Sequence, residues 1–88
     1  MPSLQEKLIE LGYDVVVTTD DDRFVYARKE LDYVEICINF LDGKMVASVV
    51  NPISKNINRA DHINGIINGY NQLGKDLEVL ENDNEWMG

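Results

Sequence analysis

The sequence has little of several residue types that small proteins use for covalent support or metal binding. It holds one cysteine, one histidine and two prolines in 88 residues. A single cysteine excludes an internal disulfide, and these few ligands do not form a zinc cluster. The disulfide-stapled and zinc-stabilised classes of small domain are therefore excluded, and the fold has to rest on an apolar core.

Long apolar runs and basic residues are scarce too. No run approaches the roughly 18 apolar residues that a membrane-spanning helix needs. The first residues lack the basic and apolar regions of a signal peptide, so we expect a cytoplasmic protein. Eight Lys and Arg stand against 16 Asp and Glu, which gives a net charge of −8. Such a surface repels nucleic acid and anionic membranes and attracts basic protein surfaces, so we expect a basic protein partner.

The apolar share of 44% is ordinary for a folded chain and predicts one domain over residues 1–80, followed by an acidic tail over 81–88. The stretch from Tyr33 to Val50 predicts a β-hairpin, because two β-prone runs flank Asp42-Gly43. A two-residue turn there predicts that three pairs share one apolar face. The pairs are Phe40 with Met45, Ile38 with Ala47, and Ile36 with Val49.

Two further strands are predicted before this hairpin, at residues 13–19 and 23–29, on either side of an acidic turn. A turn at Asp21-Asp22 would pair Val17 with Tyr26. The connection to the next strand leaves two registers open. Three connecting residues place Phe24 and Tyr26 in the core, whereas two place Val25 and Ala27 there. We prefer three, because that register buries more apolar area.

Both ends of the chain predict helices. Ser3 and Glu6 form a capping box, and Gly12 is a plausible end for a short first helix. Asn58 is a candidate N-cap for a long second helix, in which Gly74 predicts a kink or an early end. Its apolar residues recur at helical spacing. They are Ile63, Ile66, Ile67, Tyr70, Leu73, Leu77 and Leu80.

These elements predict an α+β fold in the order α-β-β-β-β-α. The four strands form an antiparallel meander, and both helices pack on one face of the sheet.

No pattern in the sequence predicts catalysis. The run Asp20-Asp21-Asp22 lacks the glycine and the closing glutamate that a calcium loop needs. His62 and Cys37 have no partner group at a spacing that would make a base or a nucleophile. We therefore expect a protein that is not an enzyme and has no catalytic residue, metal site or cofactor.

Acidic residues gather in that turn and in the C-terminal segment, where an aromatic residue could anchor a contact. The predicted partner-binding residues are Asp20, Asp21, Asp22, Asp76, Glu78, Glu81, Asp83, Glu85 and Trp86.

Two other surfaces are candidates for recognition. The polar flank of the long helix carries Asn64, Asn68, Asn71 and Gln72, although amides are a poor choice where only solubility is needed. The outer face of the sheet is unusually apolar in the preferred register and predicts a homodimer contact. Its apolar residues are Val16, Val25, Tyr33, Cys37, Val46 and Val50.

In size, acidity and element content, the chain is similar to small proteins of phages and mobile elements that inhibit nucleic-acid enzymes. Anti-CRISPR, anti-restriction and immunity proteins are of this physical type, although no shared motif carries the similarity. It implies an acidic inhibitor that acts as a DNA mimic and occupies the basic channel of a nuclease. The alternative is a homo-oligomeric structural or accessory protein that associates through the open sheet face.

Overall fold

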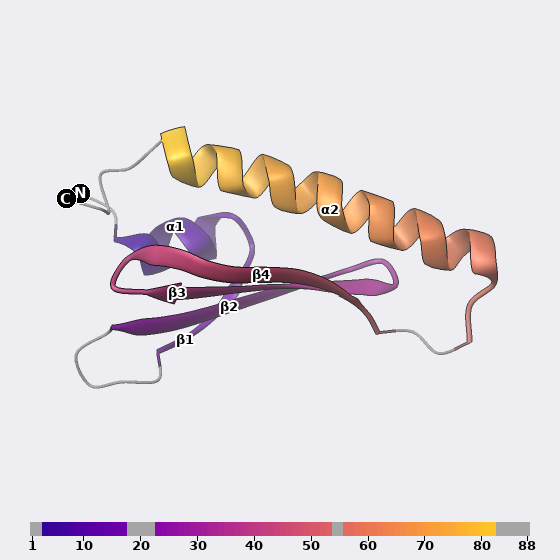
Figure 1. The fold of residues 1–88 in the computed structure, drawn as a ribbon, viewed down its shortest axis with the longest axis horizontal. Coiled ribbons are helices and arrows are strands. Elements are labelled where there is room, and N and C mark those ends of the chain that lie inside the picture. Colours follow the sequence, from indigo (N-terminus) through magenta and orange to yellow (C-terminus); the bar gives the residue numbers. More distant parts are fainter. Residues whose placement is uncertain (1–2, 18–22, 54–55, 83–88) are drawn as a thin grey trace.

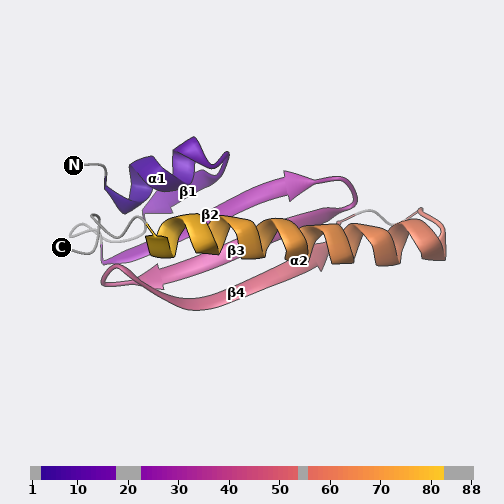
Figure 2. The same ribbon diagram turned by 90° about the horizontal axis from the view of Figure 1, so that it is seen from above.

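The computed structural model describes residues 3–17, 23–53 and 56–82. Its elements are α1 (Leu4–Glu10), β1 (Asp14–Val17), β2 (Phe24–Leu31), β3 (Val34–Leu41), β4 (Lys44–Pro52) and α2 (Arg59–Asn82). The strands form one antiparallel sheet in the order β1-β2-β3-β4. Both helices lie on the same face of this sheet, α2 along its length and α1 near one end (Figures 1 and 2). The predicted α+β meander is confirmed.

The helix ends follow local chemistry. The Ser3 hydroxyl accepts a hydrogen bond from the Glu6 amide at 3.2 Å, which caps α1. Gly12 follows the helix with φ of 96°, a conformation that glycine adopts without a Cβ clash. Asn58 caps α2 by accepting from the Asp61 amide at 2.8 Å. Helix α2 then continues through Gly74 to Asn82, so the early end predicted at Gly74 is wrong. Packing on the sheet before and after this glycine holds the helix together.

The connection between β2 and β3 is the two-residue turn Asp32-Tyr33, with Leu31 opposite Val34. The preferred three-residue connection is therefore wrong, and its alternative is confirmed, because Val25 and Ala27 are buried. Buried apolar area taken alone favours the three-residue connection. The observed register also places Lys29 on the inner face, where it finds a buried carboxylate on α2.

The outer two pairings also differ from prediction by one residue. Tyr26 lies opposite Val16 instead of Val17, which puts Val15 and Val17 on the inner face. The hairpin between β3 and β4 begins as predicted, with Phe40 opposite Met45. A bulge then shifts the register.

The bulge at Asn39/Phe40 places Ala47 opposite Asn39 and Val50 opposite Ile36. As a result Val50 is buried, whereas Ala47 and Val49 lie on the outer face and are exposed. Met45 keeps its predicted partner Phe40 but is exposed as well, so the predicted place of all three in the core is wrong. A bulge inserts one residue and reverses which side chains face the core. The sequence of β4 does not reveal it, since β4 is apolar on both faces.

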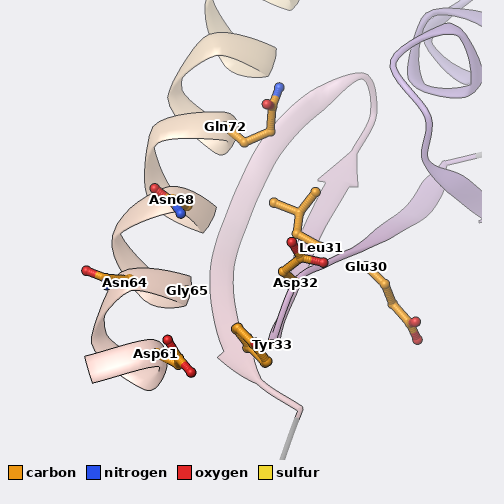
Figure 3. Close-up of a pocket in the computed structure, with 9 residues that line it drawn as sticks. All are labelled: Glu30, Leu31, Asp32, Tyr33, Asp61, Asn64, Gly65, Asn68 and Gln72. Carbon is orange, nitrogen blue, oxygen red and sulfur yellow. The ribbon is translucent and has the colours of Figure 1, made fainter. Parts of the chain in front are cut away.

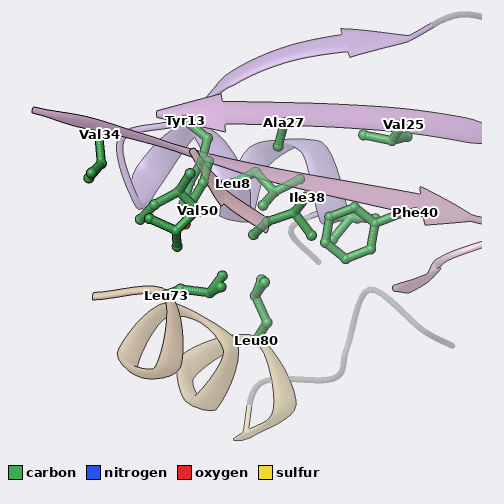
Figure 4. Close-up of a cluster of buried hydrophobic side chains, with 12 residues drawn as sticks. Leu8, Tyr13, Val25, Ala27, Val34, Ile38, Phe40, Val50, Leu73 and Leu80 are labelled. Carbon is green, nitrogen blue, oxygen red and sulfur yellow. The ribbon is translucent and has the colours of Figure 1, made fainter. Parts of the chain in front are cut away.

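The core lies between the sheet and the two helices (Figure 4). Side chains of Leu8, Ala27 and Ile38 are fully buried there, and α2 contributes Leu73 and Leu80. Of the other members of the predicted helical stripe, Ile66 and Leu77 are partly buried against the core, and three are outside it. Ile63, Ile67 and Tyr70 expose 48%, 51% and 53% of their surface.

Glycines explain this rotation of α2. Gly65, Gly69, Leu73, Asp76 and Leu80 are its buried residues. A Cβ atom at Gly69 would lie 2.6 Å from Val50 Cγ1, so only glycine allows the helix to approach the sheet this closely. The face that carries the two glycines is therefore turned inward.

A buried ion pair fixes α2 to the opposite half of the sheet. Asp76 is 3% exposed, and its Oδ2 accepts from Lys29 Nζ and from the Tyr13 hydroxyl, each at 2.7 Å. Gln72 Nε2 donates to the other carboxylate oxygen at 3.0 Å, and Lys29 also donates to the Leu11 carbonyl at 2.9 Å. Burial and the Asp76 carboxylate raise the pKa of Tyr13, which keeps its hydroxyl a donor. The pair thus joins α2, β2 and the segment that links α1 to β1.

Two of the three glycines of α2, Gly69 and Gly74, should respond in opposite ways to an added methyl group. Gly69→Ala should destabilise the protein by about 1–3 kcal/mol, because the new Cβ overlaps Val50. Gly74→Ala is the matched control, since nothing lies within 4 Å of its Cβ position, and it should stabilise the helix by up to about 1 kcal/mol. Urea denaturation of both variants measures this difference. Equal effects would contradict the assigned helix face.

Removing the buried Asp76 carboxylate should destabilise the protein strongly, whereas removing the exposed Glu78 carboxylate should have little effect. Asp76→Ala should lower the free energy of unfolding by about 3–5 kcal/mol, because the Lys29 ammonium stays buried without its partner. Glu78→Ala on the exposed side of α2 should change it by less than about 0.5 kcal/mol. The double variant Lys29→Met/Asp76→Leu should recover most of the loss in thermal denaturation. A double variant no more stable than Asp76→Ala would show that the charge is not the cause.

Candidate functional site

The predicted partner-binding residues separate into three groups. Asp20, Asp21, Asp22, Asp83, Glu85 and Trp86 lie outside the described residues. Glu78 and Glu81 are exposed on α2. Asp76 is buried in its ion pair with Lys29, so it is not part of the acidic surface, and we remove it from the partner-binding set. Sequence proximity grouped it with the others, but on a helix its side chain points to the opposite side from Glu78.

A groove of about 810 Å³ lies between the N-terminal half of α2 and the turn that joins β2 to β3 (Figure 3). Three carboxylates and three amides line it, and none of its lining residues is Lys or Arg. The lining residues are Glu30, Leu31, Asp32, Tyr33, Asp61, Asn64, Gly65, Asn68 and Gln72.

One wall of the groove follows directly from the spacing of residues on α2. Asn64, Asn68 and Gln72 are four residues apart, so their amides stack along one flank of the helix. Three of the four amides that the sequence singled out thus line the groove, and Asn71 does not. Asp61 lies three residues before Asn64 and extends the same flank.

The other wall is the Asp32-Tyr33 turn, which packs tightly against α2. A Cβ atom at Gly65 would lie 3.1 Å from Tyr33 Cβ and 3.2 Å from the Asp32 carbonyl oxygen. The Tyr33 carbonyl also accepts from the Ile53 amide at 3.0 Å, which ties the turn to the end of β4. Two ordered elements therefore hold the lining groups in place before any ligand arrives.

The charge of the groove is only partly neutralised from within. Glu30 pairs with Arg28 at 3.0 Å, although its side chain stays 61% exposed. Asp61 accepts a hydrogen bond from the Asn58 side chain at 3.0 Å, a neutral donor. Across the described ranges, neither Asp32 nor Asp61 forms an ion pair with a Lys or Arg side chain. A cation in the groove would therefore meet two carboxylates that no described base neutralises.

The outer face of the sheet is more polar than predicted. Val25 and Val50 lie in the core, and the register places Arg28 and Glu35 outside, where they form an ion pair. Arg28 lowers the pKa of Glu35, so that carboxylate stays charged. This face therefore has a charged centre, with Val16 exposed on β1 at one edge of the sheet and Val49 exposed on β4 at the other.

The lone cysteine and histidine show no reactive setting. Burial raises the pKa of Cys37, whose sulfur accepts from the Tyr26 hydroxyl at 3.2 Å, and a protonated thiol is a weak nucleophile. His62 is half-buried on α2. Within residues 3–17, 23–53 and 56–82, no three His, Cys, Asp or Glu side chains gather as a metal ion would need.

Sequence reasoning missed the carboxylates of the groove. The signal from Asp61 was present, because it continues the spacing of the amides. Asp32 and Glu30 join the site only through the length of their turn, which the sequence left open between two and three residues.

Among the helices in the described part of the chain, none is long and apolar enough to cross a bilayer. Comparisons of the sequence and the structure with protein-family models, curated proteins and solved structures found no match.

Proposed function

We propose that this protein is a non-enzymatic binding module that recognises a basic segment of another protein through the groove beside α2. The observation that carries the proposal is the lining itself. Asp32 and Asp61 line the groove together with three side-chain amides, and no lining residue carries a positive charge.

The chemistry of the groove fits an arginine or lysine side chain. A guanidinium presents five N–H donors in a planar fork that matches carboxylate oxygens. Asp32 and Asp61 supply such oxygens from the two walls, and the lining residues Asn68 and Gln72 add neutral amide oxygens along the helix. The aromatic ring of Tyr33, which also lines the groove, adds a surface over which a cation can lie.

The net charge of −8 supports the same kind of partner at longer range. An acidic protein is steered towards a basic surface and associates faster with it, and added salt weakens this effect. The exposed Glu78 and Glu81 on α2 add to this field. Together with the acidic turn and the C-terminal segment predicted from the sequence, they act mainly on the rate of association.

A nucleic-acid enzyme is the partner class that best matches this surface, since such enzymes hold a basic channel for phosphates. A small acidic protein that fills the channel excludes the nucleic acid, which is how a polyanion mimic inhibits. The protein would then act as an inhibitor of the kind that phages and mobile elements carry. Acidity, small size and a groove for cations support this finer proposal.

A peptide of nine arginines is a defined probe for the groove. Calorimetry at three salt concentrations should show binding that weakens as salt rises. The double variant Asp32→Asn/Asp61→Asn should weaken binding at least tenfold, because it removes both groove carboxylates that no described base neutralises. Each change keeps the size of the side chain, and Asn at 61 can still accept from Asn58.

The matched control is Glu78→Gln/Glu81→Gln, which removes the same charge from the exposed C-terminal part of α2. It should weaken binding about two- to threefold and flatten the salt dependence. An equal loss in both double variants would show that the peptide responds to net charge and not to the groove. Unchanged binding in the groove variant would exclude the groove as the site.

A further inference from the structure

The strand β4 is an unprotected edge of the sheet. It spans nine residues and has β3 as its only neighbour in the sheet that the structure describes, whereas the opposite edge, β1, has four residues. Natural proteins usually protect long edges with charges, proline or a covering segment. Here Lys44 is the only charged residue in β4, and Pro52 stands at its very end. The bulge at Asn39/Phe40 is the one other feature of β4 that can hinder pairing with a further strand.

An apolar flank of α2 continues this edge. Ile63, Tyr70 and Leu77 recur every seven residues and therefore lie along one side of the helix. Leu77 shares a small cavity of about 190 Å³ with Lys44 and Met45, which places this flank over β4. The amides of the groove lie on the other flank, towards the turn between β2 and β3.

Exposed apolar residues therefore follow both sides of this edge strand. Val49 lies opposite Cys37 on the outer face of the sheet, whereas Met45, opposite the buried Phe40, lies on the inner side with the flank of α2. Ile67 stands one helical turn from Ile63 and Tyr70, on the solvent side of that flank. We name this strip the β4–α2 edge. It consists of Met45, Val46, Val49, Ile63, Ile67 and Tyr70, all of them exposed.

We propose that the β4–α2 edge binds a second copy of this chain. The two β4 strands would pair antiparallel about a two-fold axis, giving one eight-stranded sheet, and the flanks of the two α2 helices would pack across the axis. Antiparallel pairing suits identical strands, because each copy presents the same row of amides and carbonyls to the other. The proposal is independent of the function proposed for the groove.

The distribution of charge favours a second copy over a basic partner at this edge. Residues 43–60 contain no Asp or Glu, although the chain has 16 of them. Two copies that each carry −8 repel one another across most of their surfaces, and this edge is where that repulsion is weakest. A basic protein would find no carboxylate on β4 to pair with.

The available area is also sufficient. Six side chains exposed by 39% to 57% present on the order of 500 Å² of surface per copy, or about 1,000 Å² for two. That reaches the lower limit for a specific interface of about 1,000 Å², and the paired backbones add to it. We therefore expect a dimer that dissociates on dilution.

Sedimentation velocity over a range of micromolar to millimolar concentrations tests this proposal. The protein should shift from monomer to dimer, and Met45→Lys/Tyr70→Lys should raise the dissociation constant at least tenfold, because both residues are exposed on the side of the edge that α2 covers. The matched control is Val16→Lys, at a valine that is 49% exposed near the opposite edge of the sheet, and it should leave the dimer intact. Circular dichroism checks that all variants keep the fold.

Amide hydrogen exchange provides a second measurement that needs no variant. Protection of the β4 amides should rise with protein concentration, while protection of β1 stays constant. The proposal is overturned by a strict monomer at millimolar concentration whose β4 amides exchange at the same rate as in dilute solution. It is equally overturned by a dimer that Val16→Lys breaks and the edge variant does not, which would place the contact on the outer sheet face.

Discussion

The contact between Lys29 and Asp76 determines how the long helix lies on the sheet. A lysine on the inner face of β2 needs a buried partner, and the carboxylate of Asp76 meets it at 2.7 Å. This requires Lys29 to point inward, which the two-residue turn at Asp32-Tyr33 provides. It also requires α2 to rotate its glycine-bearing face onto β3 and β4. Both surfaces proposed for recognition result from that rotation.

The two flanks of α2 carry different chemistry as a consequence. On the flank near the turn between β2 and β3, amides and Asp61 face Asp32 across a groove. On the flank over β4, Ile63 and Tyr70 stay exposed next to an edge strand that carries no carboxylate. A cationic ligand and a second copy would therefore not compete for the same surface. One helix could present an acidic site and an apolar site at the same time.

Local patterns in the sequence predict the element order, the two helix caps and the amide flank. These features depend on residues within a few positions of one another, such as Ser3 with Glu6 and Asn64 with Asn68. The strand registers are different, because either face of β2 and β4 is apolar enough to be buried. Three features of the folded chain determine which face is buried. They are the Lys29 ion pair, the approach of Gly69 to Val50, and the bulge between β3 and β4. The acidic groove depends on the same contacts, so only its helical wall could be predicted.

A cationic partner should bind at the groove and not at the β4–α2 edge. Titration of the ¹⁵N-labelled protein with a nine-arginine peptide, followed by amide chemical shifts, tests it directly. We expect the largest shifts at Asp32, Tyr33, Asn64 and Asn68, and no change along residues 45–50 at a protein concentration where the chain is monomeric. Shifts concentrated in β4, or spread evenly over all acidic residues, would contradict the account.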